Sequence, residues 1–397
     1  MFRTALILGL LSAVGPFAID MYLPAMPAIS AGLGAEVAEV QYTLIAYFVA
    51  FGVAQLVYGP WADQAGRKAP MYVGITVFLL ATVGCALAPS IDWLIAFRAL
   101  QGVGSAALMV VPRAVIRDLH TGAAATRLMA MVMLVISVSP MLAPLAGSAL
   151  IIMGDWRLIF WALACAALIS LLLTATVLPE TLAPENRIPI NLSNLAKGAG
   201  ILLRDPVFMG LTFVGACGFA SFMVFIASAS FVYTEQFGLG PTQFSLAFAV
   251  NAIGFFAASQ AAAPLGERWG ALTVIRWASI GFALSATLLF AVLSLGFVSL
   301  GIVMTGLFAA NACLGLIIPT TMVMALDPHG EIAGLASSLG GTLQMVTGGL
   351  IVVLSGGFFD GTAIPMVGAI AFCALASLVL ALLTLRSMAR VDVSTPT

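Results

Sequence analysis

The sequence predicts an all-α polytopic membrane protein with twelve transmembrane helices in two pseudo-symmetric six-helix halves. Of its 397 residues, 62% are hydrophobic and only 8% are charged, and the mean hydropathy is +1.14. Soluble domains carry about 25% charged residues, so 15 basic and 16 acidic side chains are too few to cover a globule of this length in water. The apolar excess must therefore face lipid, where only helices or closed barrels satisfy their own backbone hydrogen bonds.

Long unbroken apolar runs such as residues 158–178 favour helices, because barrel strands would alternate apolar and polar residues. Turn residues and charges divide the chain into candidate spans, most of them of about 20 residues or more, as a bilayer requires. The twelve predicted spans are 4–30, 41–61, 70–89, 92–113, 126–152, 157–178, 206–233, 242–263, 271–294, 297–325, 333–356 and 363–386.

The longest hydrophilic connection predicts the division into halves. We expect an N-terminal half over residues 1–178, a cytoplasmic linker over 179–205 and a C-terminal half over 206–397. Leu192–Leu203 in the linker is expected to form a short helix at the membrane surface. A repeat of proline, acid and glycine, Pro60–Gly66 and Pro264–Gly270, falls in the corresponding connections, which suggests duplicated transporter halves with the binding site between them.

Basic residues predict the orientation, because they concentrate in cytoplasmic connections. With a cytoplasmic N-terminus, only Arg98 and Arg157 fall within a span or on the outer side. The remaining basic residues all fall on the inner side: Arg3, Arg67, Lys68, Arg113, Arg117, Arg127, Arg187, Lys197, Arg204, Arg268, Arg276, Arg386 and Arg390. We therefore expect a multi-pass protein with both termini cytoplasmic, placed in the bacterial inner membrane.

Asp20 and Arg98 are charged residues within the predicted spans, where charge is costly and points to function. Counted from the outer ends of their helices, the two lie within one to two turns of each other in depth. Burial favours a neutral acid and a nearby guanidinium favours the anion, so such a carboxylate can exchange protons as its surroundings alternate. We expect Asp20, Arg98 and Gln101 to couple proton movement to transport; a fixed ion pair, a helix-end position or simple packing are the structural alternatives.

Four segments resemble the major facilitator superfamily. Gly59–Lys68 looks like its loop 2–3 signature, Arg98–Gly104 its helix 4 signature, and Ser139–Gly147 the helix 5 signature of its antiporters. Asp20–Pro27 is similar to the drug:proton antiporters of the bicyclomycin and chloramphenicol resistance type. The resemblance implies proton-coupled efflux, with a latch formed by Asp63 and a helix N-terminus or a basic partner such as Arg117.

Two segments are expected to control gating. Gly59 and Gly66 would allow a tight turn, and prolines with a small residue would bend and thin the fifth span so that it moves against a partner. The expected gating residues are Gly59, Asp63, Gly66, Arg67, Arg117, Pro140, Pro144 and Gly147.

Isolated polar and aromatic residues within the spans are candidates for substrate contact, since aromatic surface with few polar groups suits amphiphilic compounds. The candidates are Tyr47, Phe222, Phe225, Asn251, Asn311 and Gln344. We expect no metal site, because His120 and His329 are far apart in the sequence and no cysteine has metal-ligand spacing. The sequence also lacks a phosphate-binding loop and an HExxH motif, so we expect an ion gradient and not ATP hydrolysis as the energy source, and no cofactor. Nucleic-acid binding is disfavoured by the net charge of −1.

The leading hypothesis is a monomeric, proton-coupled antiporter that exports small hydrophobic or amphiphilic compounds, with protons, small-molecule substrates and the lipid bilayer as its partners. It would act in multidrug efflux and antibiotic resistance. The alternative is a proton-coupled exporter of one endogenous metabolite, such as an amino-acid derivative or a metallophore. An importer, a membrane-embedded enzyme and a non-transporting receptor are less consistent with the motifs and with the scattered acidic and histidine residues.

Overall fold

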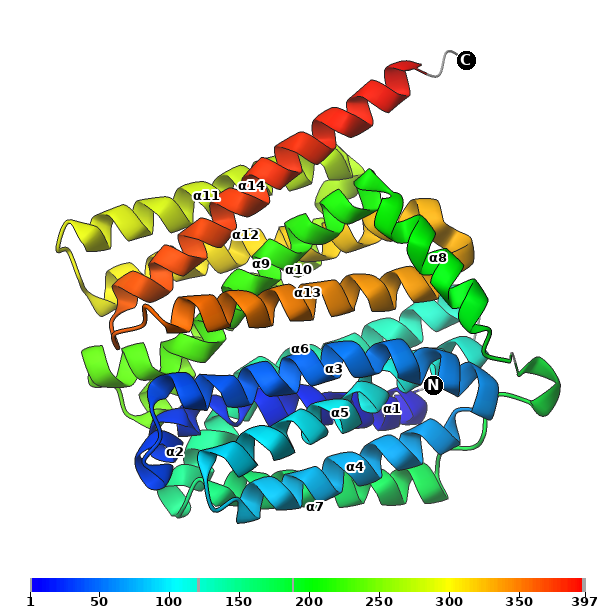
Figure 1. Cartoon of the computed structure of the whole chain (residues 1–397), viewed down its shortest axis with the longest axis horizontal. Coiled ribbons are helices and arrows are strands. Elements are labelled where there is room, and N and C mark those ends of the chain that lie inside the picture. Colours follow the sequence, from blue (N-terminus) through cyan, green and yellow to red (C-terminus); the bar gives the residue numbers. More distant parts are fainter. Residues whose placement is uncertain (1, 120–121, 188, 395–397) are drawn as a thin grey trace. The chain divides into compact units, whose positions relative to one another are not determined.

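The computed structural model describes residues 2–119, 122–187 and 189–394, and every regular element in these ranges is a helix (Figure 1). Twelve helical segments of the described chain are long and apolar enough to cross a membrane, which confirms the predicted number of spans. Several extend beyond the predicted ends. The second span runs over Val37–Ala65 and the fourth over Ile91–Leu119, so Arg113 and Arg117 lie in a helix and not in a connection.

The helices up to the linker are α1 (Phe2–Asp20), η1 (Leu23–Ala25), α2 (Met26–Leu33), α3 (Val37–Ala65), α4 (Lys68–Leu87), α5 (Ile91–Leu119), α6 (Gly122–Met153), α7 (Arg157–Thr176) and η2 (Pro184–Asn186). From the linker onward they are α8 (Leu192–Arg204), α9 (Pro206–Phe231), η3 (Val232–Gln236), α10 (Pro241–Trp269), α11 (Ala271–Ser294), α12 (Leu300–Leu326), η4 (Asp327–Ile332), α13 (Ala333–Gly356) and α14 (Ala363–Ser394).

The chain forms two compact units. The first unit comprises the residues up to Asn191 together with Gly240–Ala249, and the second comprises Leu192–Leu239 and the residues from Val250 onward. In the first unit, α1 packs against α5, α6 and α7, and α4 packs against α5 and α7. In the second, α9 packs against α12, α13 and α14, and α11 packs against α12 and α14. Since α9 and α11 are the first and third spans of their half, as α1 and α4 are of theirs, the two units repeat one packing scheme.

The repeated Pro–acid–Gly segment has the same local structure in both places. Pro60 lies inside α3 and Pro264 inside α10, and a glycine of positive φ follows each helix: Gly66 at 90° and Gly270 at 83°. Such φ values favour glycine because it has no Cβ. The tight turn expected at Gly59 is wrong, because α3 continues through it to Ala65.

The first span is interrupted beside the buried carboxylate. A proline has no backbone N–H, so Pro24 cannot donate to the carbonyl of Asp20 four residues earlier. The α-helical ladder ends at Asp20, and a short 3₁₀ segment, η1, leads into α2. The interruption therefore places Asp20 at a helix end within the span and not in the middle of a regular helix.

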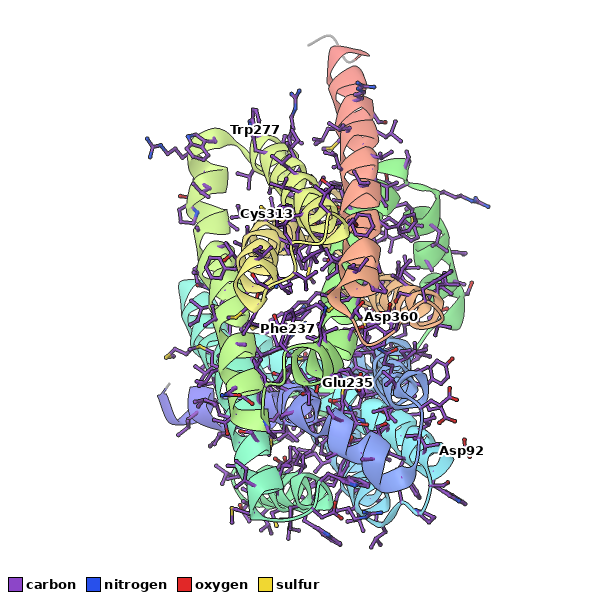
Figure 2. All side chains as sticks on the ribbon, turned by 90° about the vertical axis from the view of Figure 1, so that its left-hand side faces the viewer. Asp92, Glu235, Phe237, Trp277, Cys313 and Asp360 are labelled. Atoms are coloured by element: carbon purple, nitrogen blue, oxygen red, sulfur yellow. The ribbon has the colours of Figure 1, made fainter. Side chains whose placement is uncertain are left out.

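The linker contains the expected short helix, α8, which packs against α9 and α13. Asp205 follows it and caps α9: its carboxylate oxygen Oδ1 accepts the backbone N–H groups of Val207 at 2.8 Å and Phe208 at 3.3 Å. At another edge of the same unit, η3, which carries Glu235, adjoins the connection that carries Asp360 (Figure 2). There the backbone N–H of Ala363 donates to Oε1 of Gln236 at 2.8 Å.

Candidate functional site

Asp20 is a buried carboxylate, 6% exposed, at the end of α1. The hydroxyl of Ser139 in α6 donates to its Oδ2 at 3.1 Å. The carboxylate therefore bridges α1 and α6, the helix of the antiporter-like segment. Among the ion pairs found in the described residues, none joins Asp20 to Arg98. The structure therefore does not contain the fixed ion pair that was one alternative to proton coupling.

Arg98 is fully buried in α5 and lies at the same end of α1. Its Nη1 donates to the backbone oxygen of Ala18 at 3.1 Å and to Oε1 of Gln101 at 2.6 Å. The amide nitrogen of Gln101 donates in turn to Thr82 at 2.8 Å. Arg98 and Gln101 are thus in direct contact, and they reach the α1 backbone two residues before Asp20.

Two tyrosine rings surround the Arg98 guanidinium. Its Cζ lies 4.6 Å from the ring centroid of Tyr22 and 4.5 Å from that of Tyr47. A desolvated cation over aromatic faces is stabilised by the ring quadrupoles. Within the described part of the chain, Nε and Nη2 of Arg98 are buried without a hydrogen-bond partner. The cage therefore stabilises the charge and leaves N–H donors that could bind an acceptor when the helices rearrange.

The tyrosine hydroxyls are bonded to neighbouring helices. Tyr47 donates to Ser105 at 2.6 Å, and the hydroxyl of Tyr22 lies 2.6 Å from that of Thr43. Tyr47 is completely buried against Arg98. Its position supports a contact with the Arg98 guanidinium more directly than the substrate contact expected from the sequence.

Small residues allow α6 to approach the interruption in the first span. A Cβ on Gly147 would collide with the backbone oxygen of Met21, so α6 lies directly against the residue that follows Asp20. Pro140 and Pro144 lie inside the helix. The hydroxyl of Ser245 in α10 donates to the carbonyl oxygen of Pro144 at 2.9 Å. The antiporter-like segment therefore both positions Asp20 and contacts the start of α10.

The gating residues after α3 form an ionic cluster. Arg67 donates through Nη1 to Asp63 at 2.6 Å, and through Nε and Nη2 to the two carboxylate oxygens of Asp118 at 2.8 and 3.0 Å. Bidentate pairs of this kind combine charge with fixed geometry. The partner of Asp63 is therefore Arg67 and not Arg117. Arg67 follows Asp63 by four residues, so its side chain reaches back to the same end of α3.

Glu180 ties the beginning of the linker to the same cluster. Its carboxylate accepts the backbone N–H groups of Arg67 at 2.8 Å and Lys68 at 3.1 Å, which open α4. Thr181 donates to Asp118 at 2.7 Å. Burial acts to raise the pKa of Glu180, but the backbone hydrogen bonds hold this pKa below its usual value. A linker carboxylate thus serves as the cap of α4.

In the second unit, the expected substrate residues form two groups and one separate position. The amide nitrogen of Asn311 in α12 lies 3.4 Å from the amide oxygen of Asn251 in α10, and both residues are buried. The ring of Phe222 is 6.5 Å from that of Phe225 and stacks on Phe255 at 5.6 Å. Gln344 lies elsewhere, in a pocket between α9, α12 and α13.

Sequence reasoning missed several residues of these clusters, namely Tyr22, Thr82, Asp118, Ser139 and Glu180. Ser139 and Tyr22 lie inside the recognised segments, so the helical period could have suggested which face they share with other polar groups. Asp118 and Glu180 lie outside the predicted spans, and no local pattern indicated that they meet beside Arg67.

The chain is similar to known proteins over most of its length. A family model described as Major Facilitator Superfamily matches residues 8–352. The chain is 34% identical over 371 residues to the uncharacterized MFS-type transporter YdgK of Bacillus subtilis, covering 93% of this chain and 91% of that protein. It is 31% identical over 376 residues to a bicyclomycin resistance protein homolog of Haemophilus influenzae, covering 94% and 93% of the two chains. It is 30% identical over 360 residues to multidrug resistance protein D of Escherichia coli, covering 88% and 87%.

Proposed function

Because the chain belongs to the major facilitator superfamily, and is therefore a transporter rather than an enzyme, we propose that it is a proton-coupled antiporter that exports small hydrophobic or amphiphilic compounds. Transport would proceed by alternating access in the bacterial inner membrane, with both termini cytoplasmic and the monomer as the working unit. The names of two relatives, which refer to bicyclomycin and multidrug resistance, support the class of cargo.

The observation that carries the proton coupling is the burial of Asp20 without an ion-pair partner among the described residues. An ionised carboxylate in such surroundings is costly, so opening of the site to water changes the balance between its two protonation states. Ser139 connects this carboxylate to α6, which also contacts Met21 through Gly147. Movement of α6 against α1 would therefore change the environment of Asp20 directly.

Arg98 and its two tyrosine rings would transmit the protonation state of Asp20 to other helices of the first unit. Arg98 contacts the α1 backbone at Ala18, and its partner Gln101 contacts Thr82 in α4. Its buried Nε and Nη2 donors have no partner in the described chain. A deprotonated Asp20 carboxylate that approached them would gain charge-assisted hydrogen bonds. Protonation would remove that attraction, which gives the cycle two states with different helix contacts.

The residues after α3 would act as the gate on the linker side. Arg67 joins α3 to the end of α5 through Asp63 and Asp118, and Glu180 adds the linker to this connection. Charge-assisted bonds that join helix ends can stabilise one state of a transporter and must break in the other. The proposed gating roles of Gly66, Arg67 and Asp63 rest on these contacts.

The test is transport by purified protein in liposomes with an imposed proton gradient. We expect gradient-driven movement of chloramphenicol and bicyclomycin, opposite in direction to proton movement. Asp20→Asn should lose gradient-driven transport while keeping exchange of labelled for unlabelled compound. Asp92→Asn, an exposed carboxylate at the start of α5, is the matched control and should transport normally.

Full gradient-driven transport by Asp20→Asn would refute the coupling role of this residue. A broad substrate panel separates the two cargo hypotheses, because protection of cells against chemically diverse compounds supports multidrug efflux. A response to a single endogenous metabolite would favour the narrow exporter instead.

A further inference from the structure

The start of α7 contacts the interrupted first span in two places. The ring of Phe160 lies 6.0 Å from that of Tyr22 at an angle of 59°, and both side chains are fully buried. A Cβ on Gly32 would lie 3.0 Å from Nε1 of Trp156, so the indole rests on the bare backbone near the end of α2. A helix to which the proposed function gives no role therefore contacts the segment that follows Asp20.

Tyr22 lies where the regular hydrogen bonds of the helix stop. It belongs to the interruption between α1 and η1, and its backbone N–H donates to the oxygen of Ile19 at 3.2 Å, three residues back and not four. Pro24 supplies no N–H to continue the α-helical ladder. The position of the ring therefore depends on side-chain contacts: its hydroxyl lies 2.6 Å from that of Thr43, and Phe160 lies against the ring itself.

Phe160 is in turn held by the residues that open α7. The ring of Trp156 meets it edge-on at 6.0 Å and 84°, and Trp156 is almost completely buried. Cζ of Arg157 lies 4.2 Å from the centroid of that indole, and its Nη2 donates to the backbone oxygen of Ala88 at 3.2 Å. Ala88 is the C-cap residue of α4. A chain of contacts thus runs from the end of α4 through three side chains to the ring of Tyr22.

The ring of Tyr22 covers a cation that has unused donors. Cζ of Arg98 lies 4.6 Å from its centroid, and Nε and Nη2 of Arg98 have no hydrogen-bond partner among the described residues. None of the ion pairs found in the described chain joins Arg98 to Asp20. An arginine that reached Asp20 would favour the ionised carboxylate, and so would water that entered beside a displaced ring. The position of the Tyr22 ring therefore affects how firmly Asp20 holds its proton.

The other titratable groups around Asp20 and Arg98 are neutral at neutral pH, because they are tyrosines and a cysteine. They are Tyr22 at the interruption, Tyr47 in α3 and Cys85 in α4. From α6 comes the hydroxyl of Ser139, and α7 has no charged residue after Arg157. No second carboxylate is among these groups. In the described part of the chain, the approach of Arg98 is therefore the charge effect that acts on Asp20.

We infer that Phe160 is a positioning residue for Asp20: it holds the ring of Tyr22 over the Arg98 guanidinium and so keeps this cation apart from the carboxylate. Trp156 supports Phe160 in that position. The inference rests on the proposed coupling role of Asp20 and deepens it, since it names the contact that sets the proton affinity of this carboxylate.

Reaction of Asp20 with dicyclohexylcarbodiimide provides a test that does not require transport, because this reagent modifies protonated carboxylic acids. The modified fraction of the Asp20 peptide is measured by mass spectrometry on the purified full-length protein across a series of pH values. Phe160→Leu should lower the pH of half-maximal modification by about one unit, because both Arg98 and water would favour the ionised form. The external pH of half-maximal gradient-driven transport should move in the same direction. A purely structural role would reduce the yield of folded protein and move neither midpoint.

Further variants separate the ring contact from a general loss of packing. Phe282→Leu removes a fully buried ring from α11 in the second unit and should leave both midpoints unchanged. Trp156→Phe keeps an aromatic ring and removes an N–H that has no partner in the described chain, so it should match the parent protein. Trp156→Leu should lower both midpoints by about half a unit. Phe160→Met, expected to give the same shift as Phe160→Leu, replaces that variant if it does not purify as a folded protein.

Unchanged midpoints in the Phe160 variant, a shift toward higher pH, or an equal shift in Phe282→Leu would overturn the inference. If the midpoints of the Phe160 variant are unchanged while Asp20→Asn loses coupled transport, Phe160 has no positioning role and the proposed function stands. If the modification midpoint falls while Asp20→Asn transports normally, the coupling proposal fails and the positioning role of Phe160 stands.

Discussion

The hydroxyl group of Ser139 in α6 donates a hydrogen bond of 3.1 Å to the carboxylate of Asp20 at the end of α1. Both side chains are buried. Further along α6, beyond both prolines of the segment, the backbone at Gly147 lies against the carbonyl oxygen of Met21. Ser139 and Gly147 thus hold α6 against the first span at two points, so the two helices cannot separate without changing the surroundings of Asp20.

Ser139→Ala tests this hydrogen bond. Loss of a hydrogen bond to a carboxylate costs about 1.5 kcal/mol or more, so we expect gradient-driven transport to fall roughly tenfold without loss of folding. Ser148→Ala is the matched control, because Ser148 is also buried in α6 but bonds the carbonyl of Leu145 in its own helix. The measurement is the initial transport rate in liposomes, and equal rates for the two variants would contradict the role of Ser139.

Tyr22 separates the ring contact with Arg98 from the hydroxyl contact with Thr43. Tyr22→Leu removes the ring and should lower the free energy of unfolding by about 2 kcal/mol, the value of a desolvated cation–π contact. Tyr22→Phe keeps the ring and should lower it by about 1 kcal/mol or less. Thermal unfolding in detergent gives the order, and a phenylalanine variant as unstable as the leucine variant would show that the hydroxyl dominates.

Asp118→Ala tests the ionic cluster at the end of α5. The side chain of Arg67 is 6% exposed and that of Asp118 is 13% exposed, so removal of this carboxylate leaves a buried cation paired, among the described residues, with Asp63 alone. We expect a loss of about 3 kcal/mol in unfolding free energy. The control Asp155→Ala breaks the more exposed pair with Arg157 and should cost about 0.5 kcal/mol or less. Similar losses for the two variants would show that the buried pair of Arg67 and Asp118 stabilises the protein no more than the exposed pair of Arg157 and Asp155.

Glu180 gives the cluster a defined pH dependence. Burial acts to raise its pKa, but the backbone N–H groups that it accepts favour the ionised form and hold the pKa below the ordinary value of 4.5. The stabilisation is therefore complete above the unfolded pKa and is lost as pH falls through the folded one. We expect Glu180→Gln to be less stable than the parent protein at neutral pH, with a difference that shrinks below pH 4.5. Unfolding midpoints measured against pH check this, and a difference that grows on acidification would contradict it.

The number of spans and the charged residues within them were predictable because both depend on local composition. Charge is rare within the apolar runs, so Asp20 and Arg98 were evident without a structure, and Gln101 lies one helical turn from Arg98. The partner of Asp20 was not predictable in this way. Ser139 is 119 positions away in the chain, and a serine within a span carries no signal of its own.

The error at Gly59 has a related cause. A Gly–Pro pair usually marks a turn, but Pro60 lies within α3, and the helix ends only before Gly66. Likewise, Asp118 and Glu180 lie outside the predicted spans 92–113 and 157–178, although α5 extends to include Asp118. Their meeting beside Arg67 depends on how α4, α5 and α7 pack, which composition does not determine.

The paired glycines Gly66 and Gly270 provide the last prediction, since they follow equivalent helices with φ of 90° and 83°. Gly270→Ala introduces a Cβ with nothing within 4 Å, so its effect isolates the backbone cost, which we expect to be about 1 kcal/mol. Gly66→Ala adds a collision with the Glu180 carboxylate at 2.6 Å and should cost more. Gly59→Ala, also in open space but inside α3, should be neutral or stabilising because alanine is the better helix former. Thermal unfolding of the three variants should give the order Gly66, Gly270, Gly59 from the largest loss to the smallest; equal losses at Gly66 and Gly270 would show that Glu180 yields to the added methyl group.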